Sequence, residues 1–179
     1  GKSEAELAGK LIKEVNSKFD AYFTSVQKRA IHTIEIILDI LNKKNSEIKK
    51  AWELNERHYG ALTGLNKDEM VKKHGEKQVH IWRRSFSIAP PPMEETNLNH
   101  PSKNKAYINI PTSKIPSCES LKNTFERVMP YYEENIKPLL SSNKNILITA
   151  HGNSLRALCK KLFNISDKKI VGFEIPTGN

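Results

Sequence analysis

Apolar residues recur every three to four positions in several parts of the chain, and this spacing predicts amphipathic helices. Ser3 and Glu6 have the spacing of a capping box, and Asn66 and Gly75 are typical of a helix start and stop. Ser25 is the expected N-cap of the second helix, and Pro130 is expected to kink or restart the helix that contains it. The predicted helices begin near residues 3, 25, 66, 117 and 152.

Short apolar runs bounded by polar residues predict strands at 21–25 and 146–150, and a weaker strand at 49–52. The first and last runs lead directly into a predicted helix. The order strand, helix, strand, then a loop with helices, then strand and helix is typical of an α/β fold with a mainly parallel sheet flanked by helices. No internal repeat is visible, and we expect a single domain.

The segment Ser87–Pro116 carries six of the nine prolines and shows little periodicity. A loop of this length inside a compact domain is usually functional. We therefore expect it to act as a lid over a ligand.

Composition and charge narrow the class of protein. The 179 residues are 37% hydrophobic, which suits one globular domain, and neither a membrane-length apolar run nor a signal peptide is visible. Cys118 and Cys159 have no disulfide or zinc-type spacing, so we expect a reducing, cytoplasmic location and no structural zinc site. The net charge of +9 suits a nucleic acid or a small polyanionic substrate. Interleaved acids, few aromatics and no recognised motif favour the small polyanion, with no nucleic-acid partner.

His151 is the first candidate for chemistry, because it follows the last predicted strand and precedes a helix. Ligands of open α/β sheets bind at such strand ends, and helix N-termini favour anions. Arg29 lies one turn into the helix after the first strand and can reach back to the same edge. A phosphate site is therefore predicted there. A buried core histidine and an ordinary exposed arginine are the alternatives.

Two further clusters combine charged and aromatic side chains. Glu56 adjoins Arg57 and His58 just after a probable strand, so it could be ionised or tuned for proton transfer; a salt-bridged loop is the alternative. The arginine pair at 83–84, with Lys67 upstream, could bind a carboxylate or phosphate. The alternative interpretation of this pair is a solvated basic face. Residues 116–121 are interpreted only as a capped helix start.

Together these segments resemble one family, the 2,3-bisphosphoglycerate-dependent phosphoglycerate mutases of the histidine phosphatase superfamily. The resemblance runs in order along nearly the whole chain. Asn55–Tyr59 combined with Trp82–Arg84 is more specific than the histidine motif alone and indicates the mutase branch. The matching segments are 23–30, 54–64, 81–84, 90–92, 150–156 and 175–178.

The resemblance implies a three-layer α/β/α fold and a glycolytic enzyme that interconverts 3-phosphoglycerate and 2-phosphoglycerate. The reaction would pass through a phosphohistidine primed by 2,3-bisphosphoglycerate, without a metal, in a homodimer or homotetramer. Glu56 matches the general acid/base, and His151 the second active-site histidine. Arg29 matches the arginine on the transferring phosphoryl group. The positions that match other contacts to the ligand are Tyr59, Lys67, Arg83, Arg84, Gly152 and Asn153.

One motif of that family is missing from these residues. The resemblance places the nucleophilic histidine in an Arg-His-Gly motif on a first strand, and no Arg-His-Gly occurs here. Gly1–Ser3 corresponds to the first helix, and the family continues beyond Asn179, so we expect a partial domain, incomplete at both ends. A bisphosphoglycerate mutase or phosphatase of the superfamily, and a non-catalytic phosphoglycerate-binding relative, are the open alternatives.

Overall fold

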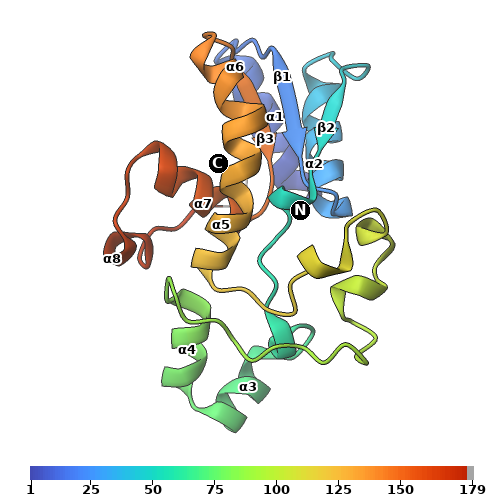
Figure 1. Cartoon of the computed structure of the whole chain (residues 1–179). Helices are drawn as coiled ribbons and strands as arrows, with labels where there is room; N and C mark the ends of the chain where they lie inside the picture. The colour runs from blue at the N-terminus through green and yellow to red at the C-terminus, as the bar shows by residue number, and fades with distance from the viewer. Residues whose placement is uncertain (177–179) are drawn as a thin grey trace.

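A computed structural model describes residues 1–176 and shows a parallel three-stranded sheet in the order β2-β1-β3 (Figure 1). The strands are β1 (Ala21–Thr24), β2 (Ile48–Lys50) and β3 (Ile146–Thr149). Thr24 lies opposite Thr149 in the β1–β3 register, so both strands end at the same edge of the sheet. The α/β prediction with a mainly parallel sheet is confirmed.

The two faces of the sheet bury different residues because side chains alternate along a strand. Tyr22 packs with Ile34 and Leu38 of α2 (Lys28–Ile40) on one face. Phe23 packs on the other face against α5 (Leu121–Tyr131) and α7 (Gly152–Leu162). Helix α1 (Lys2–Glu14) packs on α2. These contacts give the three layers that the resemblance implied.

The remaining helices lie away from the sheet or complete its cover. A π-helical turn at Tyr132–Ile136 joins α5 to α6 (Lys137–Ser141). Helices α3 (Lys67–His74) and α4 (Glu76–Arg84) form a separate pair below the sheet in Figure 1. Helix α8 (Asp167–Ile170) follows α7. No helix in the described part is both long and apolar enough to cross a membrane.

Several predicted helix ends are wrong by a few residues. Helix α1 begins at Lys2 with Gly1 as its N-cap, and the N-cap position of α2 is Gln27, without a side-chain cap bond, and not Ser25. Helix α5 starts after Ser120, whose side chain accepts from the Asn123 N–H, and not from residue 117. Pro130 does not restart this helix, which runs to Tyr131 and then widens into the π-helical turn. Helix α4 was not predicted.

The cap of α3 was predicted correctly. The Asn66 side chain accepts a hydrogen bond from the Asp68 N–H, and the helix ends at Gly75. Of the family-like segment at 175–178, Thr177 and Gly178 lie outside the described residues.

The proline-rich segment contains short 3-10 turns and is anchored to the rest of the molecule. Tyr107 is buried, and the Pro91 carbonyl accepts a hydrogen bond from the Ala61 N–H. Gly60 adopts φ +56°, and a Cβ there would lie 2.2 Å from the Pro91 carbonyl oxygen. The segment is thus held close to residues 55–61, where the chemistry is predicted.

Candidate active site

His151 and Arg29 meet at the edge where β1 and β3 end. His151 is the N-cap of α7 and 5% exposed. Its Nδ1 accepts a hydrogen bond from Arg29 Nε at 3.0 Å, so Nε2 carries the proton and donates to Ser25 Oγ at 2.8 Å. The prediction that both residues reach one edge is confirmed, and Ser25 is a site residue that the sequence interpretation missed.

The imidazole of His151 is neutral in this arrangement. Burial lowers its pKa to about 3, and the positive charges of Arg29 and Arg127 act in the same direction. The Arg29 side chain is 67% exposed, so its guanidinium faces solvent and is free to receive an anion. A phosphoryl group bound here would meet the Arg29 guanidinium beside the imidazole, whose two ring nitrogens are hydrogen-bonded to Arg29 and Ser25.

Glu56 lies beside Arg29 and is hydrogen-bonded to α7. Asn153 Nδ2 donates to Glu56 Oε1 and to the Tyr59 hydroxyl, both at 3.0 Å. Arg29 Nη2 lies 3.8 Å from Glu56 Oε2. A carboxylate between a cation and an amide donor suits proton transfer to and from a bound hydroxyl. The structure therefore brings Glu56, Asn153, Tyr59, Arg29 and His151 together.

A cleft of about 260 Å³ opens next to Asn153. Arg83 and Arg84 reach it from the last turn of α4, and Gly152 from the start of α7. Arg84 is ion-paired with Glu174 at 2.6 Å. The side chain of Lys67, at the start of α3, is outside what the structure describes. The cleft is lined by Tyr59, Arg83, Arg84, Gly152, Asn153, Arg156, Phe173, Glu174 and Ile175.

Two buried arginines, Arg156 in the lining of the cleft and Arg57 against Tyr59, were given no ligand role from the sequence. The Arg57 guanidinium stacks over the Tyr59 ring at 4.4 Å, with that of Arg83 at 5.8 Å. Burial lowers the pKa of Arg57 and of Arg156, which lies one turn into α7. Concentrated positive charge around a small cleft favours a polyanionic ligand.

Residues 116–121 do more than start a helix, which corrects the sequence interpretation. The Glu119 carboxylate, 2% exposed, binds Arg127 in two-pronged fashion at 2.7 and 2.8 Å. It also accepts hydrogen bonds from the backbone N–H of His58 at 3.0 Å and from its Nδ1 at 2.9 Å. Burial alone would raise the pKa of Glu119, but the bonds from His58 and Arg127 outweigh it and lower the pKa to about 2.

Arg127 and Tyr107 extend this cluster beneath the loop that carries Glu56. Arg127 Nη1 donates to the Glu53 carbonyl at 2.7 Å, and Tyr107 OH contacts His58 Nε2 at 2.7 Å. Asn55 Nδ2 donates to the same hydroxyl at 2.8 Å. Sequence spacing offers little signal for this cluster because its members come from separate segments. We call Asn55, His58, Tyr107, Glu119 and Arg127 the Glu119 cluster.

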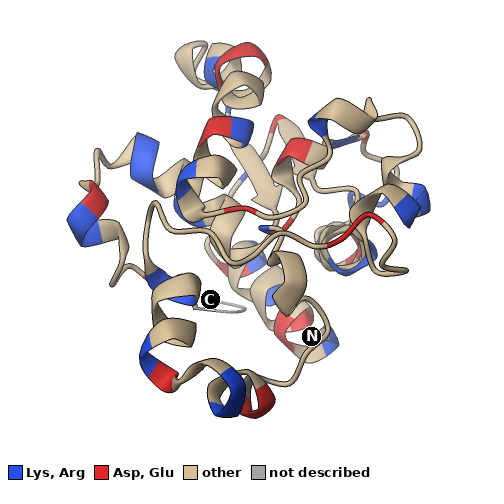
Figure 2. Cartoon of the chain, turned by 60° about the horizontal axis from the view of Figure 1, so that its bottom comes forward, with Lys and Arg blue, Asp and Glu red and all other residues tan. Residues whose placement is uncertain are grey.

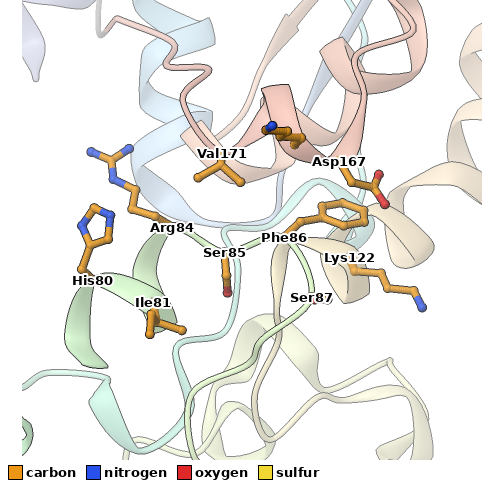
Figure 3. Close-up of a pocket in the computed structure, with 10 residues that line it drawn as sticks. His80, Ile81, Arg84, Ser85, Phe86, Ser87, Lys122, Asp167 and Val171 are labelled. Carbon is orange, nitrogen blue, oxygen red and sulfur yellow. The ribbon is translucent and has the colours of Figure 1, made fainter. Parts of the chain in front are cut away.

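A second cavity, of about 530 Å³, also borders α4 (Figure 3). Arg84 lines both cavities, and Figure 3 shows it beside His80 with Phe86 and Lys122 across from them. Basic and acidic positions are spread over many segments of the described chain (Figure 2). Within the described residues, no group of three or more His, Cys, Asp or Glu side chains is placed to hold a metal ion.

Comparison with known proteins identifies the family. Residues 1–99 match the model of the histidine phosphatase superfamily, branch 1. All 179 residues are 52% identical to the 2,3-bisphosphoglycerate-dependent phosphoglycerate mutase of Pelagibacter ubique and span 75% of its length. The chain belongs to the 2,3-bisphosphoglycerate-dependent phosphoglycerate mutases. The mutase of Buchnera aphidicola subsp. Cinara cedri is likewise 52% identical over 178 residues, which span 77% of its length.

More distant structures share the mutase fold. A mycobacterial glucosyl-3-phosphoglycerate phosphatase complexed with VO3 matches 99% of this chain and 75% of its own, with a TM-score of 0.71 and 17% identity. The α-ribazole phosphatase of Shigella flexneri matches 99% of this chain and 72% of its own, with a TM-score of 0.61 and 20% identity. At such identities the likeness concerns the fold alone.

Proposed function

We propose that this phosphoglycerate mutase interconverts 3-phosphoglycerate and 2-phosphoglycerate through a phosphohistidine primed by 2,3-bisphosphoglycerate. The observation that carries the proposal is the convergence of Arg29, Glu56 and His151 on one sheet edge, joined through Asn153 to an arginine-lined cleft. The mutase names of relatives at 52% identity support the same activity. The substrate is a phosphorylated three-carbon acid.

In the proposed reaction, the phosphohistidine gives its phosphoryl group to the 2-hydroxyl of 3-phosphoglycerate while Glu56 takes the hydroxyl proton. The bisphosphate reorients and returns its 3-phosphoryl group to the histidine. Glu56 gives the proton back to the oxygen that is left, and 2-phosphoglycerate is released. Fixed cations lower the barrier because the transferred group carries spread negative charge.

In this proposal the remaining site residues bind the ligand. Arg29 and His151 bind the phosphoryl group in transit, and Gly152 and Asn153 contact the ligand beside it. Tyr59, Lys67, Arg83 and Arg84 bind the carboxylate and the other phosphate. None of the six histidines of the chain is assigned as the phosphorylated one, because none lies in an Arg-His-Gly motif.

The test is conversion of 3-phosphoglycerate by the full gene product that carries these residues. We expect formation of 2-phosphoglycerate that depends on 2,3-bisphosphoglycerate, and loss of turnover in Arg84→Met. Lys122→Met is the matched control, because it removes a cation from the second cavity only. Release of inorganic phosphate as the main product would instead indicate a phosphatase, and binding without turnover a non-catalytic relative.

We also propose a cytoplasmic homodimer or homotetramer. Light scattering on the purified full gene product would test the assembly, with a monomer at micromolar concentration as the contradicting result.

A further inference from the structure

Arg156 is buried beside the cleft and makes hydrogen bonds in two directions. It is 6% exposed and lies on the inner face of α7. Its Nη1 donates to Asn153 Oδ1 at 3.0 Å, and its Nη2 donates to the Ile170 carbonyl of α8. Its Nε has no hydrogen-bond partner among the described residues. Burying a guanidinium costs free energy, because the charge loses its hydration. A buried arginine at this position therefore suggests a specific role.

The contact with Asn153 decides which way the amide points. An arginine has only donors, so the amide oxygen must face Arg156. The amide nitrogen therefore faces Glu56 Oε1 and the Tyr59 hydroxyl. A reversed amide would set its oxygen against the Glu56 carboxylate and its nitrogen against the guanidinium, which loses both interactions.

We propose that Arg156 is a positioning residue that orients the Asn153 amide toward Glu56 and Tyr59. The inference rests on the proposed mutase function, in which Glu56 transfers the proton and Tyr59 binds substrate. Arg156 acts through Asn153 and does not touch the reacting atoms. Its second bond to Ile170 holds the guanidinium plane in place, so the orientation of the amide depends on the docking of α8.

No described carboxylate forms an ion pair with Arg156, so its positive charge is uncompensated by a direct partner. Glu174 of the same cleft pairs with Arg84 instead. Its hydrogen bonds go to neutral acceptors, the Asn153 amide oxygen and the Ile170 carbonyl, and the fork of donors sets the amide. A lysine has the charge without the planar fork.

A double-mutant cycle tests this role. We expect Arg156→Met and Asn153→Ala each to lower kcat/KM of the full gene product by about tenfold or more. The double variant should lose less than about twofold beyond Asn153→Ala alone, because Arg156 then has no amide to orient. Losses that multiply would overturn the inference, since they would show that Arg156 acts independently of Asn153.

Lys160→Met is the matched control for the structural contribution of Arg156. Lys160 Nζ donates to the Ile165 carbonyl at 2.7 Å and pairs with Asp167 at 2.6 Å, so it anchors the same terminal segment without touching Asn153. We expect a lower Tm with kcat/KM within about twofold of the parent. A loss equal to that of Arg156→Met would overturn the inference in favour of α8 docking alone.

Arg156→Lys serves if Arg156→Met does not fold. It retains the charge without the fork, so kcat/KM should still fall by about tenfold, again with no further loss in the Asn153→Ala background. Full activity of Arg156→Lys would overturn the amide-orienting role. If the parent protein shows no mutase turnover, the proposed function fails; a normal parent with an additive cycle refutes the inference alone.

Discussion

Glu119→Gln should remove most of the acid-sensitive part of the stability of this protein. The pKa of Glu119 is about 2 in the folded chain, against 4.5 for an ordinary glutamate. At about 1.4 kcal/mol per pKa unit, this difference of about 2.5 units corresponds to about 3 kcal/mol of stabilisation. Because the folded-state pKa is the lower one, the stabilisation is complete above about pH 4.5 and disappears as the pH falls through about 2.

The assay is urea unfolding of the parent and the variant at several pH values between 2 and 6. We expect the free energy of unfolding of the parent to fall by about 3 kcal/mol more than that of Glu119→Gln over this range. At pH 6 the variant should itself be less stable by about 3 kcal/mol, because Arg127 is left as a buried charge without its carboxylate.

The pKa values of exposed carboxylates such as Asp20 and Glu133 are also lowered by their partners. Their contribution to the pH dependence is the same in parent and variant, so it cancels in the difference between the two proteins. Equal pH dependence in parent and variant would refute the assignment of the acid-sensitive stability to Glu119.

Four other outcomes are expected. Glu56→Gln should leave substrate binding by calorimetry nearly intact and lower kcat by about a hundredfold or more, and full activity would remove Glu56 from its role. The His151 ring should show no NMR titration between pH 5 and 8, because its pKa lies near 3; in Arg29→Met the midpoint should rise but stay below 6.5, since burial persists, and a parent midpoint near 6.5 would contradict this. Gly60→Ala should destabilise the fold by about 2 kcal/mol or more in thermal unfolding, because of its φ of +56° and the contact with Pro91; an unchanged Tm would contradict it. Substrate should protect Ser87–Pro116 from proteolysis if this loop closes as a lid, and unchanged cleavage with bound ligand would count against closure.

The sheet and the strand-end residues were predictable from local pattern and chain order. Short apolar runs marked β1 and β3, and parallel strands that lead into helices place their carboxyl ends together. Arg29 and His151 are 122 positions apart, and the structure sets them 3.0 Å from each other. Residue pattern also singled out Glu56 and the pair at 83–84, and the family resemblance added their roles, Tyr59 and the start of α7. The structure places these residues in or beside one cleft.

The helix caps were less predictable because several polar side chains can satisfy the same backbone groups. Ser25 has the right type and place for a cap, yet its hydroxyl contacts His151 and accepts from the Gln27 N–H. Ser117 and Ser120 are equally good caps by sequence, and the match of Ser120 with Asn123 selects the second. Which serine caps a helix therefore depends on the hydrogen-bond partners that the folded chain places next to its hydroxyl.

The Glu119 cluster and the orientation of Asn153 could be found only in the folded chain. Glu119 accepts a hydrogen bond from a backbone N–H 61 positions away, and Arg127 donates to carbonyl groups more than 70 positions away. No periodicity in the sequence predicts either contact. The local pattern of apolar residues predicts which face of a helix or strand is buried, and the order of elements predicts which strand ends lie at the same edge of the sheet. The pairing of buried charges and the direction of a buried amide depend on which donors and acceptors packing brings within about 3 Å of each other. A buried polar group without a partner costs more free energy than a local conformational preference contributes.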